Sequence, residues 1–166
     1  MEFILTRRSI RKYTAEPVAP EDVEDLLRAA MSAPSARNEQ PWHFIVITEQ
    51  EVKETLMEMH PYAKMLVEAP VAILVCGDKT LETSPGYWMI DCSAATQNIL
   101  LAAHSKGLGA VWLGVYPRQE RMEPFAKLMG LPEHVIPFSL VALGHPAEEK
   151  PPADRFNPER IRYNRW

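Results

Sequence analysis

Four cations and a hydroxyl group lie within six residues near the N-terminus of an otherwise acidic chain. The run is Arg7-Arg8-Ser9-Ile10-Arg11-Lys12, and it follows Thr6, which could cap a short helix. Arginine side chains bind phosphate oxygens through paired N–H donors, a serine hydroxyl adds a donor, and a helix N-terminus offers free N–H groups. The run therefore indicates a site for a dianionic phosphate. A solvated basic turn is the alternative, because runs of charge usually lie on a surface.

A second group of candidate residues lies in a loop bracketed by prolines. The loop is Pro34-Ser35-Ala36-Arg37-Asn38-Glu39-Gln40-Pro41, and the aromatic segment Trp42-His43-Phe44 follows it directly. The amides of Asn38 and Gln40 could hydrogen-bond a planar heterocycle that carries alternating donors and acceptors. A helix-to-strand turn whose amides bond their own backbone explains the same residues equally well.

A glycine-rich segment, Gly107-Leu108-Gly109-Ala110-Val111-Trp112-Leu113-Gly114, superficially matches a dinucleotide-binding fingerprint. However, it follows an expected helix and enters an expected strand, and its third glycine is misplaced. The fingerprint requires the opposite order, a strand followed by a helix. We therefore reject a Rossmann-type site.

Helices that could position these residues are expected at four places. Prolines and acids at the starts, glycines after the ends, and apolar residues at helical spacing predict the ranges 20–31, 48–59, 87–106 and 118–129. Thr48 and Glu51 would open the second helix as a capping box. The helix at 87–106 is apolar on nearly every side, which predicts that it is buried all round, partly by a partner chain.

Strands are expected at 42–47, 71–76, 110–115 and 139–143, where runs of β-branched and aromatic residues are bounded by turn residues. Together with the helices, they predict a mixed α/β sandwich rather than a βαβ repeat. The chain contains no repeat or internal linker, so residues 1–166 form a single expected domain. Only the tail at 146–166 differs, with prolines among alternating charges.

Composition narrows the class of protein. The 166 residues are 46% hydrophobic and 24% charged, as in a compact globular domain, and the net charge of -4 argues against a nucleic-acid binder. No stretch free of Asp, Glu, Lys and Arg exceeds 14 residues, so no membrane span is expected, and the N-terminus lacks the order of a signal peptide. Cys76 and Cys92 lack CxxC spacing, which favours a reducing cytoplasm.

Two other kinds of site are not expected. The five histidines show no HxxxH or HExxH spacing, so the sequence predicts no metal site. A serine hydrolase is also not expected, because the chain has no GxSxG elbow.

Four motifs, taken in order, resemble the FMN-dependent nitroreductase family. They are RRSIRKY, SAPSARNEQPWHF, GLGAVWLG and GHPAEEKPPADR, and they extend from Arg7 to Arg155. The resemblance implies an α+β nitroreductase-like sandwich, with a central, mostly antiparallel sheet flanked by helices, and an intertwined homodimer with two FMN sites at its interface. Residues 146–166 would form an extended C-terminal arm that packs on the partner subunit, where Tyr163 and Trp166 could dock.

The resemblance also implies which residues bind FMN. The phosphate and ribityl chain would contact Arg7, Arg8, Ser9, Arg11 and Arg155. The loop along the flavin would consist of Pro34, Ser35, Ala36 and Asn38, partly from the opposite subunit. The ring would lie beside the backbone of Trp112, Leu113 and Gly114. A backbone N–H of the last segment would lie near N5 of the ring. No side chain is expected to act as a catalytic acid or base.

The implied function is an FMN-dependent oxidoreductase that takes hydride from NADH or NADPH. By a ping-pong mechanism it would reduce a small-molecule electron acceptor, such as a nitroaromatic, a quinone-like compound or another flat electrophile. One alternative is a flavin-dependent reductase or dehalogenase of the same fold. A second is a flavin-binding protein without turnover that acts as a sensor or partner module, and a third is an interaction domain without a cofactor.

Overall fold

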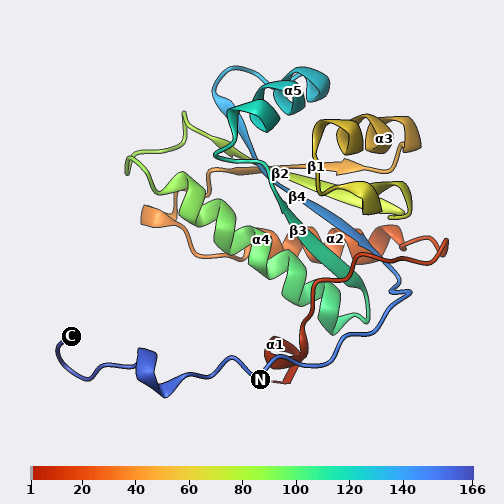
Figure 1. The fold of residues 1–166 in the computed structure, drawn as a ribbon. Helices are drawn as coiled ribbons and strands as arrows, with labels where there is room; N and C mark the ends of the chain where they lie inside the picture. Colours follow the sequence, from red (N-terminus) through yellow and green to blue (C-terminus); the bar gives the residue numbers. More distant parts are fainter. Residues whose placement is uncertain (1) are drawn as a thin grey trace.

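A four-stranded antiparallel sheet lies at the centre of the computed structural model, which describes residues 2–166 (Figure 1). The strands are β1 (Trp42–Ile47), β2 (Val71–Asp78), β3 (Gly109–Gly114) and β4 (Val135–Gly144), and their order in the sheet is β1-β2-β4-β3. Each neighbouring pair is antiparallel. The predicted α+β sandwich with a mostly antiparallel sheet is therefore confirmed, and β1 and β3 are its two edge strands.

Helices cover both faces of this sheet. Helices α2 (Pro20–Met31) and α4 (Trp88–Ser105) lie on one face, and α3 (Gln50–Met59) and α5 (Gln119–Met129) lie on the other (Figure 1). The short helix α1 (Glu2–Thr6) contacts α4, and three 3-10 turns complete the elements: η1 (Ala36–Asn38), η2 (Lys64–Val67) and η3 (Pro158–Arg160). All four predicted helices are present. None of the helices in residues 2–166 has the length and apolar character of a membrane span.

Alternate residues of the central strands fill two separate core layers, one on each face of the sheet. In β2, Val71, Ile73 and Val75 pack toward α2 and α4, while Ala72, Leu74 and Cys76 pack toward α3 and α5. This alternation follows from the two-residue period of a strand, and it requires both faces of β2 to be apolar. Cys76 and Cys92 are free and buried, and burial raises the pKa of the Cys76 thiol to about 12.

Two sequence-based details of the elements are wrong. Strand β4 begins at Val135, four residues before the predicted start, because Pro137 is accommodated where the register between β2 and β4 shifts at Val75 and Cys76. A proline normally argues against a central strand, and a bulge removes the conflict. The capping box of Thr48 is also absent, because α3 begins at Gln50 with Glu49 at its N-cap and no side-chain cap.

The expected role of Thr6 as a helix N-cap is wrong as well. Thr6 is the last residue of α1, where its hydroxyl donates to the carbonyl of Glu2 (2.9 Å) and lies 2.9 Å from His104 Nε2. The basic run after Thr6 is therefore extended chain and not a helix start. Any anion there must be bound by side chains and by individual backbone groups.

Helix α4 is less completely buried by its own chain than its apolar sequence predicts. Trp88, Cys92 and Ile99 pack against the sheet or α2, but Ile90 is 57% exposed and Ala94 and Leu101 are only half-buried. Positions 90, 94 and 101 fall on one side of a helix with 3.6 residues per turn. We call this side the open stripe of α4.

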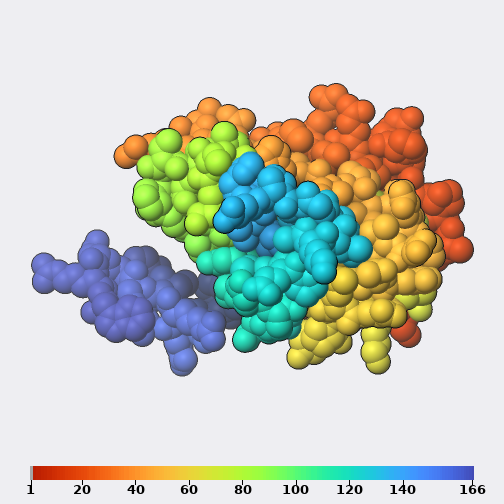
Figure 2. Space-filling model, turned by 90° about the horizontal axis from the view of Figure 1, so that it is seen from above, coloured from red at the N-terminus to blue at the C-terminus, as the bar shows by residue number. Residues whose placement is uncertain are grey.

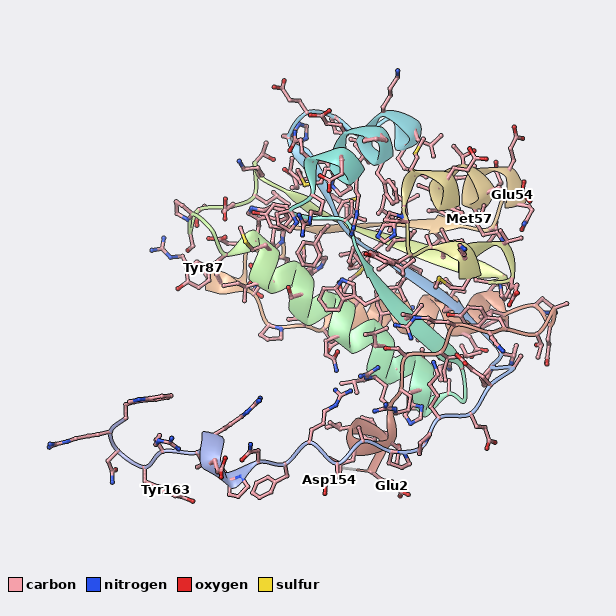
Figure 3. The ribbon with its side chains drawn as sticks, in the orientation of Figure 1. Glu2, Glu54, Met57, Tyr87, Asp154 and Tyr163 are labelled. Carbon is pink, nitrogen blue, oxygen red and sulfur yellow. The ribbon has the colours of Figure 1, made fainter. Side chains whose placement is uncertain are left out.

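The predicted C-terminal arm, residues 146–166, runs along α1 as far as Phe156 and then extends away from the folded body (Figures 1 and 2). Its aromatic side chains are solvent-exposed, with Phe156 at 77%, Tyr163 at 84% and Trp166 at 100%. Figure 3 shows Tyr163 far from the sheet, whereas Asp154 lies near Glu2 of α1. The Arg162 guanidinium lies over the ring of Trp166 (5.2 Å to its centroid), but all three aromatic side chains stay largely exposed, so a surface outside the chain is needed to bury them.

Replacing Gly77 by alanine should destabilise the fold. A Cβ atom at Gly77 would lie 2.3 Å from Cε3 of Trp88, and this ring is held by Tyr116 and Phe138 at centroid distances of 5.0 and 6.0 Å. Overpacking of this kind costs about 1–3 kcal/mol, which urea unfolding can measure. Gly114→Ala is the control, because a Cβ there meets no described atom within 4 Å. Equal stability of the two variants would contradict the packing at Gly77.

Candidate functional site

The structure brings the five residues expected at the phosphate into one polar recess of about 220 Å³. The recess is lined by Arg7, Arg8, Ser9, Arg11, Arg155 and, in addition, Lys150. Five of these six side chains are cationic. The two ends of the sequence, residues 7–11 and 150–155, therefore meet at one place on the surface.

Backbone pairing with β3 and with the chain after β4 builds this recess. Ile10 N–H donates to the carbonyl of Ala110 (3.1 Å), and Thr14 N–H donates to the carbonyl of His145 (2.9 Å). Between them, the buried Tyr13 hydroxyl lies 2.7 and 3.1 Å from the carbonyl oxygens of Ile10 and Ala142. These bonds hold residues 7–14, which we call the N-terminal strap, against the outer edge of β3.

Positive charge in the recess exceeds negative charge. The pKa of Arg7 is lowered by burial and then by the nearby Arg155 and Arg8 cations. The Nε atom of Arg8 is buried and has no hydrogen-bond partner among the described residues. A buried donor without a partner costs free energy unless a ligand satisfies it. The charge excess and the unpaired donor therefore fit a phosphate better than they fit a solvated basic turn.

One carboxylate organises the rim of the recess. Glu148 Oε1 accepts the backbone N–H of Arg11 (2.6 Å) and pairs with Lys150 Nζ (3.0 Å), and these two contacts lower the pKa of its carboxyl group. Lys150 Nζ also donates to the carbonyl of Ser9 (2.7 Å). Lys150 therefore joins the C-terminal segment to the strap, in addition to adding charge.

Beyond the strap, the outer edge of β3 presents backbone groups that have no partner strand. Val115 N–H donates to Phe138 of β4 and Ile10 N–H donates to Ala110 from the other side. Because hydrogen bonding alternates along an antiparallel pair, the backbone groups of Ala110, Trp112 and Gly114 must all face outward. The space beside Gly114 is open, since a Cβ there would meet no described atom within 4 Å. A planar ligand can therefore approach the end of this strand closely.

The predicted flavin loop has a strained backbone. Arg37, Asn38 and Gln40 have φ values of 49°, 59° and 50°, a region that residues other than glycine rarely adopt. Ser35 Oγ accepts the N–H of Gln40 (3.0 Å), and the Gln40 amide donates to the carbonyl of Asn38 (3.3 Å). The amide of Gln40 therefore bonds its own loop, as the simpler interpretation of this segment expected.

Asp91 connects this loop to α4. Its Oδ1 atom accepts the N–H of Ala36 (3.0 Å), and its Oδ2 atom is buried without a partner among the described residues. Burial is the main reason why the pKa of Asp91 is raised, and the nearby carboxylates of Glu39 and Glu82 raise it further. Backbone strain is retained only where the surroundings enforce it, and here Asp91 supplies part of that restraint.

One chain does not bring the loop and the recess together. The loop bonds Asp91 near the start of α4, whereas Thr6, which precedes the recess, contacts His104 near its end. Thirteen residues of helix separate these contacts by about 20 Å. The loop also precedes β1, the edge strand opposite to β3. The expected site residues therefore form two groups in a single chain.

Sequence reasoning missed Lys150 and Asp91, and only Asp91 had a distinguishing signal. Lys150 lies within the fourth motif, five residues before Arg155, but nothing local distinguishes it from Lys12. Asp91 is the only acidic residue within α4. An acid in an otherwise apolar helix usually has a specific partner, and that criterion would have identified it.

Comparison with known proteins agrees with this arrangement. The model of the Nitroreductase family matches residues 4–60 and 54–145. A protein of Methanothermobacter thermautotrophicus, provisionally named NADH dehydrogenase/NAD(P)H nitroreductase, is 55% identical over 166 residues, covering 100% of this chain and 87% of the relative. The family model covers the first three motifs, and the match to the Methanothermobacter protein covers all four.

Solved structures give the same result. A Parabacteroides distasonis structure, with the same provisional name, has a TM-score of 0.96 and 45% identity and covers 99% of this chain and 97% of its own. A provisionally named nitroreductase from Desulfovibrio desulfuricans, in complex with FMN, has a TM-score of 0.86 and 34% identity, with coverages of 99% and 96%. The chain therefore belongs to the nitroreductase family, as the four motifs predicted.

Asp91→Asn should change stability in a pH-dependent way. A carboxyl group whose pKa is higher in the folded than in the unfolded state favours folding when protonated, so its contribution falls as the pH rises from the unfolded pKa through the folded pKa. Asparagine keeps an acceptor for Ala36 and does not ionise. Relative to wild type, the variant should therefore be more stable at about pH 7 than at about pH 4, as measured by urea unfolding.

Asp25→Asn is a control with the opposite sign. Asp25 is exposed and lies 2.6 Å from Lys106 Nζ, and this pairing lowers its pKa. Its contribution to stability is present above the unfolded pKa and is lost as the pH falls through the folded pKa. Relative to wild type, the free energy of unfolding of this variant should therefore be lower at about pH 7 than at about pH 4. The same trend in both variants would show that Asp91 is not the cause.

Proposed function

We propose that this protein takes hydride from NADH or NADPH and reduces a flat electrophilic acceptor, such as a nitroaromatic or a quinone, by a ping-pong mechanism. As a member of the nitroreductase family, it is an NAD(P)H-dependent oxidoreductase that uses FMN. The observation that carries the proposal is the recess of five cationic side chains beside the outward-facing backbone of β3.

Each part of this edge suits one part of FMN. Arg7, Arg8, Arg11, Arg155, Ser9 and Lys150 would hold the phosphate. Two and four residues after Ala110, Trp112 and Gly114 would present N–H groups to the ring. The strand rise from Ala110 to Gly114 is about 14 Å, which leaves room for the ribityl chain. FMN held here would supply the hydride-transfer chemistry of its N5 atom. The protein holds and orients both reactants, so no side chain is required as an acid or base.

We propose that the active form is a homodimer in which the partner completes each site. Three observations support this: the open stripe of α4, the unpacked aromatic arm, and the distance of about 20 Å between the loop and the recess within one chain. A second copy could bury the stripe and the arm and supply the flavin loop of Pro34, Ser35, Ala36 and Asn38. Burial of the flavin between two chains would then couple FMN binding to dimer stability.

The catalytic proposal is tested by two half-reactions. The purified protein should be yellow and release FMN, and NADH or NADPH should bleach it without oxygen. After removal of the nicotinamide, a nitroaromatic or a quinone should restore the colour, because a ping-pong mechanism separates the two steps. A colourless protein after reconstitution, or bleaching that occurs only when both substrates are present, would contradict the proposal.

Loss of a phosphate contact should weaken FMN binding but not riboflavin binding. Removing one charge-assisted donor by Arg7→Ala or Arg11→Ala is expected to raise the FMN dissociation constant by about ten- to a hundred-fold in fluorescence titrations. Riboflavin has the ring but no phosphate, so its weaker binding should barely change. Arg28→Ala is the matched control, because Arg28 is exposed on α2 and pairs with Glu24. Equal losses of affinity for FMN and riboflavin would show that the substitution disturbs the fold and not a phosphate contact.

A charge on the open stripe should dissociate the dimer. Ile90→Glu places a carboxylate at a position that is 57% exposed in one chain but would be buried between two chains. Light scattering should therefore give the mass of a monomer, and the affinity for flavin should fall. Leu128→Glu is the control on α5, at the other face of the sheet, and should keep twice the chain mass. A flavin-loaded Ile90→Glu dimer would show that α4 does not form the interface.

A further inference from the structure

We infer that His60 and Arg121 are positioning residues for the flavin ring, which fix the last peptide of β3 and bring a positive charge to it. The inference rests on the proposed function, because it requires the ring to lie beside Gly114. It adds two residues that none of the four motifs contains.

The carbonyl oxygen of Gly114 accepts two side-chain donors. His60 Nε2 lies 2.9 Å away, and Arg121 Nη1 lies 2.7 Å away. His60 follows the last residue of α3, and Arg121 belongs to α5. The two helices on one face of the sheet thus meet at the end of its edge strand. Both donors occupy the outward side of β3, the same side that presents the N–H of Gly114.

The histidine can act only as a donor to this carbonyl. Tyr62 N–H donates to His60 Nδ1 (3.2 Å), so Nδ1 carries no proton and Nε2 must carry it. The side chain is buried, with 2% exposure, and burial lowers its pKa, which keeps the ring neutral. Protonation of Nδ1 would place its N–H group opposite the N–H of Tyr62, so two donors would face each other. The ring therefore holds one orientation at neutral pH.

The arginine supplies the charge. Its guanidinium lies 5.7 Å from the ring centroid of Tyr62, and its Nε atom is buried without a hydrogen-bond partner among the described residues. Within the same residues, no carboxylate forms an ion pair with Arg121. Its positive charge is thus held in place and is not neutralised by a neighbour, unlike that of a typical surface arginine.

These contacts have two consequences for a ring beside Gly114. First, the peptide between Gly114 and Val115 is held by His60 and Arg121, which restricts rotation about the Cα–C bond of Gly114 and so helps to fix the strand end at which the N–H of Gly114 faces outward. Second, FMN gains electron density on reduction, and a fixed cation nearby stabilises that charge. Arg121 should therefore raise the reduction potential of the bound cofactor. His60 should hold the carbonyl of Gly114, and with it Arg121, in the position in which this effect occurs.

The test is the redox equilibrium of protein-bound FMN against a reference dye without oxygen. Arg121→Met removes the charge but retains length, and it should shift the ratio of oxidised to reduced FMN about five- to ten-fold toward the oxidised form. Arg121→Lys keeps the charge and should stay within about two-fold of wild type. Arg118→Met is the matched control, because Arg118 is exposed one turn before Arg121. Only bound FMN is measured, so partial unfolding does not change the ratio.

His60 is tested by the same measurement. His60→Gln retains an amide donor and should remain close to wild type, whereas His60→Leu should shift the ratio in the same direction as Arg121→Met. Equal potentials in wild type, Arg121→Met and His60→Leu would overturn the inference while leaving the FMN site intact. A wild-type protein that binds no FMN would instead overturn the proposed function, so the two failures are distinguishable.

Discussion

Backbone hydrogen bonding at the outer edge of β3 is the constraint on which the rest of this structure depends. An edge strand leaves alternate N–H and C=O groups without a ladder partner, and each of them needs another partner. Here the strap bonds Ala110 at one end of the strand, and His60 and Arg121 bond Gly114 at the other. The backbone groups left between these ends face outward in a fixed direction. Covering both ends also protects the edge against pairing with other chains.

The recess at the start of this edge carries positive charge that is not balanced within the chain. Five cations around about 220 Å³ repel one another, and Glu148 offsets only part of that repulsion. Such an arrangement disfavours the folded state until an anion enters, which makes ligand binding a source of stability. The same reasoning applies to the loop at residues 34–40, where strained backbone is held by Asp91. The recess and the loop are thus both locally destabilising features, as expected of the binding elements that we propose.

Helix α4 connects these two elements and keeps them apart. Its sequence is apolar nearly all round, yet one chain covers only part of it, and the open stripe lies between the loop at its start and the recess near its end. A helix that is too apolar for its own chain is a common origin of a subunit interface. The geometry therefore links cofactor binding, dimer formation and burial of the C-terminal arm in one proposal.

The sequence alone determined the features that depend on neighbours in the chain. The helices at 20–31 and 118–129 and the strand at 42–47 follow from local periodicity and end signals. The predicted phosphate cluster was visible because three of its arginines, Arg7, Arg8 and Arg11, are nearly contiguous. Local signals failed where a distant contact decided the outcome, as at Pro137, which a bulge opposite β2 accommodates, and at Thr6, which ends a helix. Only the tertiary structure placed Lys150 beside Ser9, and His60 on the carbonyl of Gly114, 54 residues away. Packing of the helices on the sheet sets such contacts, and no spacing along the chain encodes them.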